Sequence, residues 1–138
     1  MNNEQVLRAF MQKVWNEKDF NSIPDFVASA YRIFLDNADP WEGKTLTHDD
    51  FKARMNYSFH AFPDMYFEIK AAIYDGNQVA ITWIMTGTNI GSIGEFPPTY
   101  KTIRTTGMTI YHFKDGKICG HSQVFDRAAV MMQLGYLE

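Results

Sequence analysis

The chain of 138 residues has the size of one domain, and its 46% hydrophobic, 15% aromatic and 21% charged residues are typical of a globular protein, not of a disordered or fibrous one. Thirteen basic and sixteen acidic side chains give a net charge of -3 without a run of bases, which argues against nucleic acid and anionic membranes as partners. No apolar run approaches the ~20 residues of a membrane-spanning helix. We expect a single domain over residues 1–138.

The first half of the chain predicts three helices and one strand. Apolar residues spaced by three and four positions predict a helix over 4–18. A shorter helix is expected over 21–28, followed by a strand over 31–35, where β-branched and aromatic residues gather. Thr47 is a suitable cap for a third helix, which Pro63 ends.

The second half of the chain predicts an antiparallel sheet. Three long runs of β-branched and aromatic residues are separated by turn sequences at 75–77 and 115–116. Residues 91–100 contain glycines and a Pro-Pro pair, so they predict a loop beside the sheet and a possible pocket rim. Asp126 precedes a short helix over 127–134 and is placed to cap it. Helices followed by a curled sheet predict an α+β domain in which the helices close one face.

The cysteine content and the N-terminus restrict the compartment and the chemistry. Cys119 is the only cysteine, which excludes an internal disulfide and a metal site built on several thiolates. The first ten residues lack the apolar segment of a signal peptide, so we expect a cytoplasmic location. The three Trp, seven Tyr and eleven Phe residues fit either an ordinary core or the walls of a ligand pocket.

Two histidines are expected on one face of the last hairpin. Pairing across the turn at 115–116 places His112 opposite Cys119 and Ile110 opposite His121. By alternation, one face then carries Met108, Ile110, His112, Cys119, His121, Gln123 and Phe125. We do not expect a metal site here, because no third ligand of suitable type lies on this face. The alternative is that one histidine is a hydrogen-bonded core residue and the other is exposed.

The sequence resembles a known enzyme family over nearly its whole length. The stretch GMTIYHFKDGKICGHSQVFDRAAVMMQLG is similar to the C-terminal signature of the SnoaL-like polyketide cyclases (the polyketide cyclase or ester cyclase family), within the superfamily of nuclear transport factor 2. The strings WEGK, AFPD, TGT and PPT precede it in family order. The resemblance implies a curved antiparallel sheet forming a cone-shaped barrel closed by N-terminal helices. It also implies a homodimer without a cofactor that closes a ring in a hydrophobic, oxygenated small molecule by aldol condensation.

The resemblance also implies a pair of catalytic residues. Asp126 matches the acid/base aspartate of the family, and His112 matches the histidine on the preceding strand. A carboxylate suffices to remove a proton from a carbon that flanking carbonyls have acidified, and a histidine can stabilise the enolate. However, strict alternation places Asp126 on the opposite face from His112 unless a bulge intervenes. If Gln123 is the residue that faces the pocket, the base is lost and a binding role is favoured.

Several other side chains are candidates for substrate contact. His121, Gln123, Met108 and Phe125 belong to the same expected face, and Trp83 could line either the pocket or a dimer interface. The helix after Thr47 and the preceding segments could direct Asn56, Tyr31 and Trp41 toward a ligand. Two functions follow: a cofactor-free cyclase, isomerase or hydrolase, or a non-catalytic ligand-binding or dimeric interaction module of the same fold.

Overall fold

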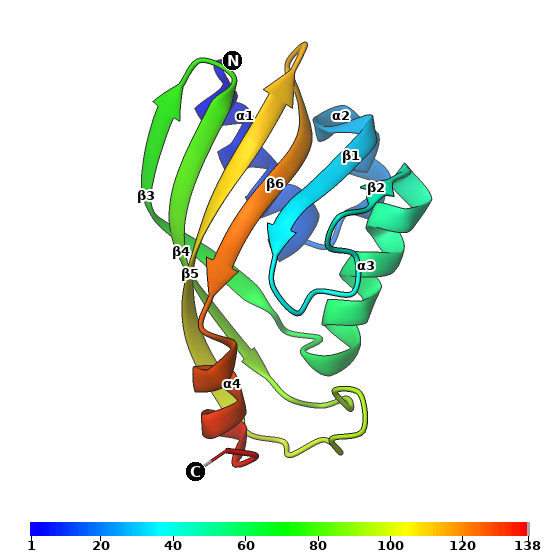
Figure 1. Cartoon of the computed structure of the whole chain (residues 1–138), viewed down its shortest axis with the longest axis vertical. Helices are drawn as coiled ribbons and strands as arrows, with labels where there is room; N and C mark the ends of the chain where they lie inside the picture. Colours follow the sequence, from blue (N-terminus) through cyan, green and yellow to red (C-terminus); the bar gives the residue numbers. More distant parts are fainter. Residues whose placement is uncertain (138) are drawn as a thin grey trace.

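The computed structural model describes residues 1–137 as four α-helices, two shorter helical segments and one six-stranded sheet (Figure 1). In chain order the elements are α1 (Asn3–Phe10), η1 (Met11–Asn16), η2 (Phe20–Ser22), α2 (Ile23–Phe26), β1 (Val27–Asp36), β2 (Thr45–Leu46), α3 (His48–Ala61), β3 (Tyr66–Asp75), β4 (Gln78–Thr88), β5 (Thr102–Lys114), β6 (Lys117–Phe125) and α4 (Arg127–Leu134). The α+β class predicted from the sequence is confirmed.

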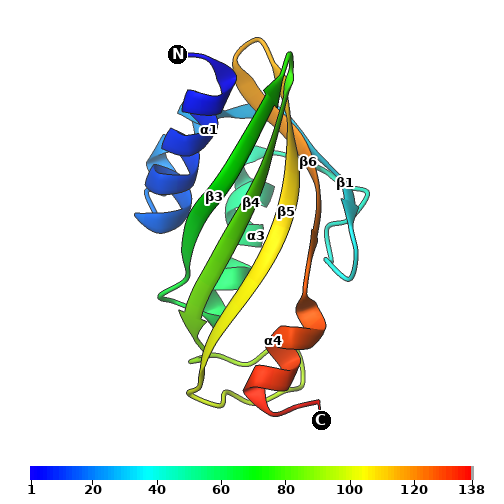
Figure 2. The same ribbon diagram turned by 90° about the vertical axis from the view of Figure 1, so that its left-hand side faces the viewer.

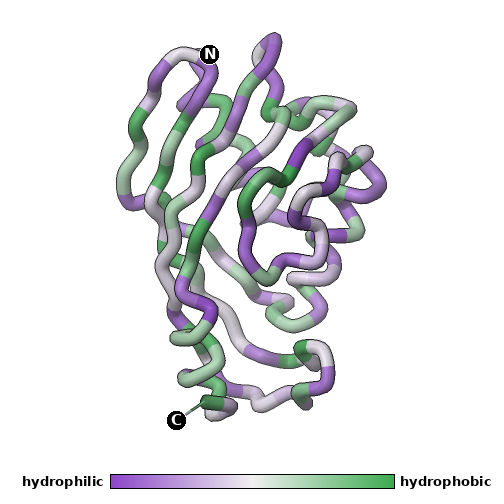
Figure 3. The backbone as a smooth tube through the Cα atoms, in the orientation of Figure 1, coloured by the Kyte–Doolittle hydropathy of each residue, from purple (hydrophilic) through white to green (hydrophobic). Residues whose placement is uncertain are grey.

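The sheet has the order β2-β1-β6-β5-β4-β3, and all its neighbours are antiparallel except β1 and β6, which are parallel. It curves, and α1 and α3 pack on one face, which we call the inner face (Figures 1 and 2). Strands β2 and β3 are its edges, so the sheet is not closed into a barrel. In β4 and β5, buried and more exposed residues alternate, as expected for a sheet with one covered face. Hydrophobic and hydrophilic residues are interspersed along the strands (Figure 3).

The N-terminal helical segments follow the predicted apolar pattern but differ in length. The expected helix over 4–18 is α1 continued by the π-helical η1, and its stripe from Leu7 to Trp15 is buried. The expected helix over 21–28 stops at Phe26, because Val27 is already extended and pairs with Ile118 of β6. The extended backbone satisfies the hydrogen-bonding groups of this segment in the sheet, which helical propensity does not reveal.

The predicted cap at Thr47 and the hairpin turn at 115–116 are confirmed. Thr47 forms a reciprocal capping box with Asp50 at the start of α3, and the turn at 115–116 joins β5 to β6 with Phe113 opposite Ile118. The loop after β4 is held by the fully buried Asn89, which bonds the backbone of Ala61, Gly91 and Thr99.

A β-bulge in the β5–β6 hairpin decides which side chains face inward. Beyond the turn the register shifts by one residue, and His112 lies opposite Gly120 instead of Cys119. The predicted pairing of Ile110 with His121 is therefore wrong, since a shift of one residue moves every following side chain to the other face.

The bulge also brings a glycine to the contact between β6 and β1. A Cβ atom at Gly120 would lie 2.5 Å from the carbonyl oxygen of Arg32, so only glycine allows the two backbones to approach this closely. The shifted register places His121 and Gln123 on the inner face opposite Tyr111 and Thr109. The position of the bulge therefore determines which polar residues face the helices.

Gly107 of β5 is a second close contact, since a Cβ atom there would lie 2.3 Å from the Cζ2 atom of Trp83. We predict that Gly107→Ala lowers the free energy of unfolding by about 1–3 kcal/mol, the usual cost of overpacking. Urea unfolding of the single and double variants measures this cost. In a Trp83→Phe background, which lacks the clashing ring atoms, the cost should be smaller; an equal cost in both backgrounds would contradict the explanation.

Candidate active site

A cavity of about 340 Å³, partly open to solvent, lies between the inner face of the sheet, α3 and the segments that follow β1 and β6. Most of its wall is apolar and aromatic, formed by Met11, Trp15, Phe51, Phe62, Met65, Phe67, Trp83, Met85, Ile93 and Phe125. Its polar side chains include Tyr31, Asp39, Arg54, His121, Gln123 and Arg127. An apolar pocket with a few convergent polar groups is the usual form of a small-molecule site.

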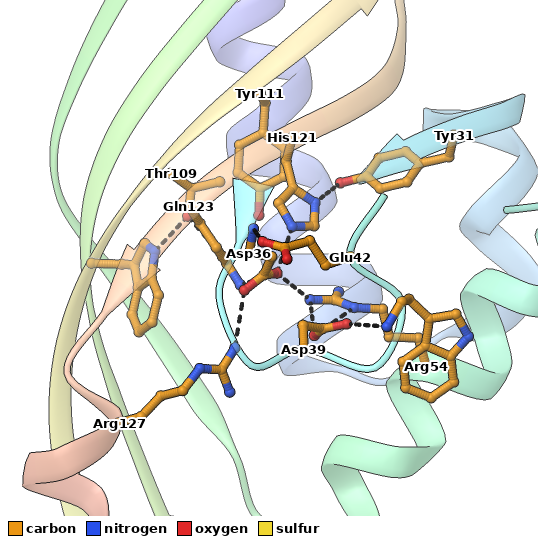
Figure 4. Close-up of polar contacts among 12 residues, drawn as sticks. Tyr31, Asp36, Asp39, Glu42, Arg54, Thr109, Tyr111, His121, Gln123 and Arg127 are labelled. Atoms are coloured by element: carbon orange, nitrogen blue, oxygen red, sulfur yellow. Dashed lines mark hydrogen bonds and ion pairs between the residues drawn. The ribbon is translucent and has the colours of Figure 1, made fainter. Parts of the chain in front are cut away.

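The polar part of the wall is organised by Asp36, the last residue of β1, which is 1% exposed (Figure 4). Its Oδ2 atom accepts hydrogen bonds from His121 Nε2 at 2.9 Å, Gln123 Nε2 at 2.9 Å and Arg54 Nη2 at 3.0 Å. Its Oδ1 atom accepts one from Arg127 Nη2 at 3.0 Å. Burial alone would raise the pKa of Asp36, but the bond from His121 and the two guanidinium charges outweigh it and lower the pKa. Asp36 is therefore an ionised carboxylate.

His121 connects Asp36 to a buried tyrosine. Because its Nε2–H donates to the ionised Asp36, its Nδ1 atom accepts the hydrogen bond from the Tyr31 hydroxyl. Burial lowers the pKa of His121 and raises that of Tyr31 well above its usual value, so the imidazole is neutral and the phenol is protonated. The result is a hydroxyl–imidazole–carboxylate chain whose hydroxyl and imidazole residues line the cavity.

A second chain of hydrogen bonds fixes the amide of Gln123. The indole Nε1–H of Trp83 donates to Thr109 Oγ1 at 2.8 Å, and the Thr109 hydroxyl donates to Gln123 Oε1 at 3.0 Å. With its oxygen occupied in this way, Gln123 directs its NH₂ group toward Asp36. One N–H of this group binds Asp36, and the other is available to a ligand.

Five of the predicted substrate contacts line the cavity, namely Tyr31, Trp83, His121, Gln123 and Phe125. The loop over 91–100 also contributes to the wall through Ile93, as the predicted pocket rim requires.

Four other predicted residues do not line this cavity. His112 and Met108 lie on the outer face of β5, because the bulge shifts their partners, and Met108 is 59% exposed. Asn56 is exposed on α3, and Trp41 packs against Tyr57, whose ring is part of the wall.

Asp126 also lies outside the cavity, at the start of α4. Its Oδ1 atom accepts a hydrogen bond from the backbone N–H of Ala129 at 2.8 Å, so it is the N-cap of this helix. The position that faces inward is Gln123, whose amide cannot act as a general base. Of the two interpretations of Asp126, the structure supports the helix cap.

Four polar residues of the site are not predicted from the sequence pattern: Asp36, Asp39, Arg54 and Arg127. Asp36 stands where a strand meets a turn-rich segment, a position at which aspartate is common for local reasons. Arg54 carried a detectable signal, because it lies three residues after Phe51 and next to Met55 on the buried stripe of α3. A charged residue on an apolar stripe implies a buried partner.

Comparison with known proteins identifies the family of the chain. The model of the SnoaL-like polyketide cyclase family matches residues 5–134, so this protein belongs to that family. No curated protein matches the sequence.

Solved structures agree with this assignment. A proposed polyketide cyclase from Acidithiobacillus ferrooxidans is 34% identical, with a TM-score of 0.91 over 99% of this chain and 96% of that one. IdmH, a proposed polyketide cyclase from Streptomyces antibioticus, is 20% identical, with a TM-score of 0.82 over 98% and 99% of the two chains. A SnoaL-like polyketide cyclase from Agrobacterium tumefaciens is 18% identical, with a TM-score of 0.81 over 98% and 99%. The last two share the fold.

Residues 1–137 contain neither a cluster of metal-ligating side chains nor a membrane-spanning helix. No group of three or more His, Cys, Asp or Glu side chains in this range is arranged to hold a metal ion. No helix in the same range has both the length and the apolar character needed to cross a bilayer.

The role of Asp126 as a cap is testable. We predict that Asp126→Ala lowers the free energy of unfolding by about 1 kcal/mol, because the N–H of Ala129 loses its partner. Asp126→Asn should stay close to the wild type, since an amide oxygen accepts the same bond. Thermal or urea unfolding measures both changes. If asparagine destabilised as much as alanine, the carboxylate charge would have a role other than capping.

The buried histidine predicts a loss of stability in acid. Because burial lowers the pKa of His121 in the folded state, the unfolded chain binds a proton at higher pH than the folded one. Stability should therefore fall as the pH drops below about 6.5, and fall further below about 4, where the lowered pKa of Asp36 has the same effect. Urea midpoints at pH 7 and pH 5 measure the first step.

The matched variants for this test are His121→Gln and His60→Gln, since His60 is an exposed residue of α3. The difference between the midpoints should shrink in His121→Gln and keep its wild-type size in His60→Gln. An unchanged difference in His121→Gln would show that another group titrates.

Proposed function

We propose that this protein is a cofactor-independent enzyme that performs acid-base chemistry of the cyclase or isomerase type on a hydrophobic, oxygenated small molecule. Membership of the polyketide cyclase family and a largely apolar cavity support this proposal. The observation that carries it is the hydrogen-bonded chain of Tyr31, His121 and Asp36 at the cavity wall. A hydroxyl next to a neutral imidazole that a carboxylate orients is the arrangement that activates oxygen in many enzymes.

The proposed first step removes a proton from a carbon that lies next to a carbonyl group. The phenol oxygen of Tyr31 accepts this proton while its own proton passes to Nδ1 of His121. The imidazolium formed is stabilised by Asp36, which already accepts the Nε2–H of His121 at 2.9 Å. The proton balance is therefore complete within the two hydrogen bonds present.

The negative charge of the enolate is stabilised by a fixed donor. The second N–H of Gln123 Nε2 is available for the enolate oxygen, and the bonds from Thr109 and to Asp36 hold this amide in place. The apolar aromatic side chains around this amide lower the local dielectric, which strengthens such a bond. Attack of the enolate carbon on a second carbonyl of the same molecule closes a ring, and the proton held on His121 returns through Tyr31 to the new alkoxide. Return of the proton to a different carbon gives an isomerase.

A non-catalytic binding module is the second candidate, and the residue at position 123 favours it. Gln123 faces the cavity at a position where a carboxylate could act as a base, and an amide cannot do so. The carboxylate of Asp36 accepts four hydrogen bonds from the protein, so it is not free to accept a proton from a ligand. In this case the same cavity holds a ligand without changing it.

A deuterium-exchange experiment separates the two candidates. With 2-tetralone, an apolar aryl ketone, in D₂O, an enzyme should accelerate exchange of the protons next to the carbonyl, as measured by NMR. Tyr31→Phe should lower this rate by about 100-fold or more, the usual contribution of a general acid or base. Tyr111→Phe, which removes a buried hydroxyl bonded to the sulfur of Met11, should have a much smaller effect.

The pH dependence adds a second readout. The rate should fall as the pH drops through the pKa of His121, which burial holds below 6.5. Ligand binding detected by tryptophan fluorescence without any exchange above background would establish the binding module and contradict the enzyme. Equal losses in Tyr31→Phe and Tyr111→Phe would contradict the proposed proton path.

A further inference from the structure

The polar wall of the cavity has more hydrogen-bond donors than acceptors. Asp36 accepts four bonds. In Asp39, Oδ2 accepts two bonds from Arg54, and Oδ1 accepts one from the backbone N–H of Trp41. The carboxylates are therefore occupied by the protein, while several N–H groups are not. A ligand in contact with this wall meets free N–H donors, which an acceptor group would satisfy.

Arg54 directs one of these free donors into the cavity. Its side chain is only 10% exposed, and its Nε and Nη2 atoms bind Asp39 and Asp36. Its Nη1 atom has no hydrogen-bond partner within residues 1–137. Every buried side-chain nitrogen or oxygen atom in that range has a partner, so Nη1 is not buried. Nη1 is therefore accessible, and since Arg54 lines the cavity, we place this access on the cavity side.

Arg127 supplies the other donors from the opposite side of Asp36 (Figure 4). Its Nη2 atom binds Oδ1 of Asp36, whereas Arg54 binds Oδ2, so one carboxylate brings the two guanidinium groups together. The guanidinium of Arg127 lies over the ring of Phe125, 4.2 Å from its centroid, which restricts its position. The side chain is 37% exposed and lines the cavity, and its other N–H groups have no partner in the part of the chain that is described.

We propose that the ligand of this cavity carries a carboxylate, which binds between Arg54 and Arg127. Asp39, Arg54 and Arg127 line the cavity, and the carboxylates of Asp36 and Asp39 balance the two guanidinium charges, so the attraction for a carboxylate comes from the free N–H groups of the arginines and not from a net positive charge. Guanidinium groups bind carboxylates through paired, charge-assisted hydrogen bonds, and a wall with low dielectric strengthens them. This inference rests on the proposed function for the use of the cavity, and it narrows the substrate class to apolar carboxylic acids.

The test compares an acid with its uncharged ester. Calorimetry with 2-naphthoate and methyl 2-naphthoate should give at least tenfold tighter binding of the acid to the wild-type protein. Arg127→Gln should weaken binding of the acid at least tenfold and leave the ester almost unchanged, and Arg127→Lys should give an intermediate loss. Arg104→Gln, which removes the same charge from an exposed position of β5, should change neither value. Melting temperatures of the variants establish that they are folded.

Three results would overturn the inference: equal affinity of the wild type for acid and ester, an equal loss for both ligands in Arg127→Gln, or no binding of either ligand. The probe for the proposed catalysis, 2-tetralone, has no carboxylate, so the enzyme proposal and the carboxylate-site proposal are tested independently of each other. Exchange on 2-tetralone without preference for the acid would overturn only the carboxylate site. Preference for the acid without exchange on any ketone would overturn only the enzyme.

Discussion

The buried carboxylate of Asp36 is the constraint on which the site depends. Asp36 is only 1% exposed, and a buried charge is stable only when hydrogen-bond donors replace the water that it has lost. Four side-chain donors bind this carboxylate. These donors come from α3 (Arg54), β6 (His121 and Gln123) and the first residue of α4 (Arg127). One carboxylate therefore fixes the relative positions of three elements around the end of β1, and these elements form the polar wall of the cavity.

The β-bulge in β6 makes this arrangement possible. It turns His121 and Gln123 to the inner face and brings Gly120 against the backbone of β1, where any side chain would collide with Arg32. The parallel pairing of β1 with β6 then carries Asp36 to the two side chains that it binds. A single inserted residue thus couples the topology of the sheet to the chemistry of the site.

The electrostatics of the site favour a neutral base and a fixed set of donors. The pKa of His121 is lowered by burial although it touches a carboxylate, because the charge of Arg54 opposes protonation as well. Under the proposed mechanism, proton acceptance belongs to the Tyr31–His121 pair, because position 123 is an amide. The free N–H groups of the two arginines then select the acidic group of the ligand.

The sequence by itself determined the local features: the apolar stripe of the first helix, the cap at Thr47, the hairpin turn at 115–116, and the alternative role of Asp126 as a cap. Each depends on residues within a few positions of one another. The tertiary structure alone decided the register beyond the bulge, and with it the exclusion of His112 and Met108 from the face that carries His121 and Gln123. It also decided the role of Asp36, because a buried charge is recognised only when its donors, up to 91 residues away in the chain, are brought to it.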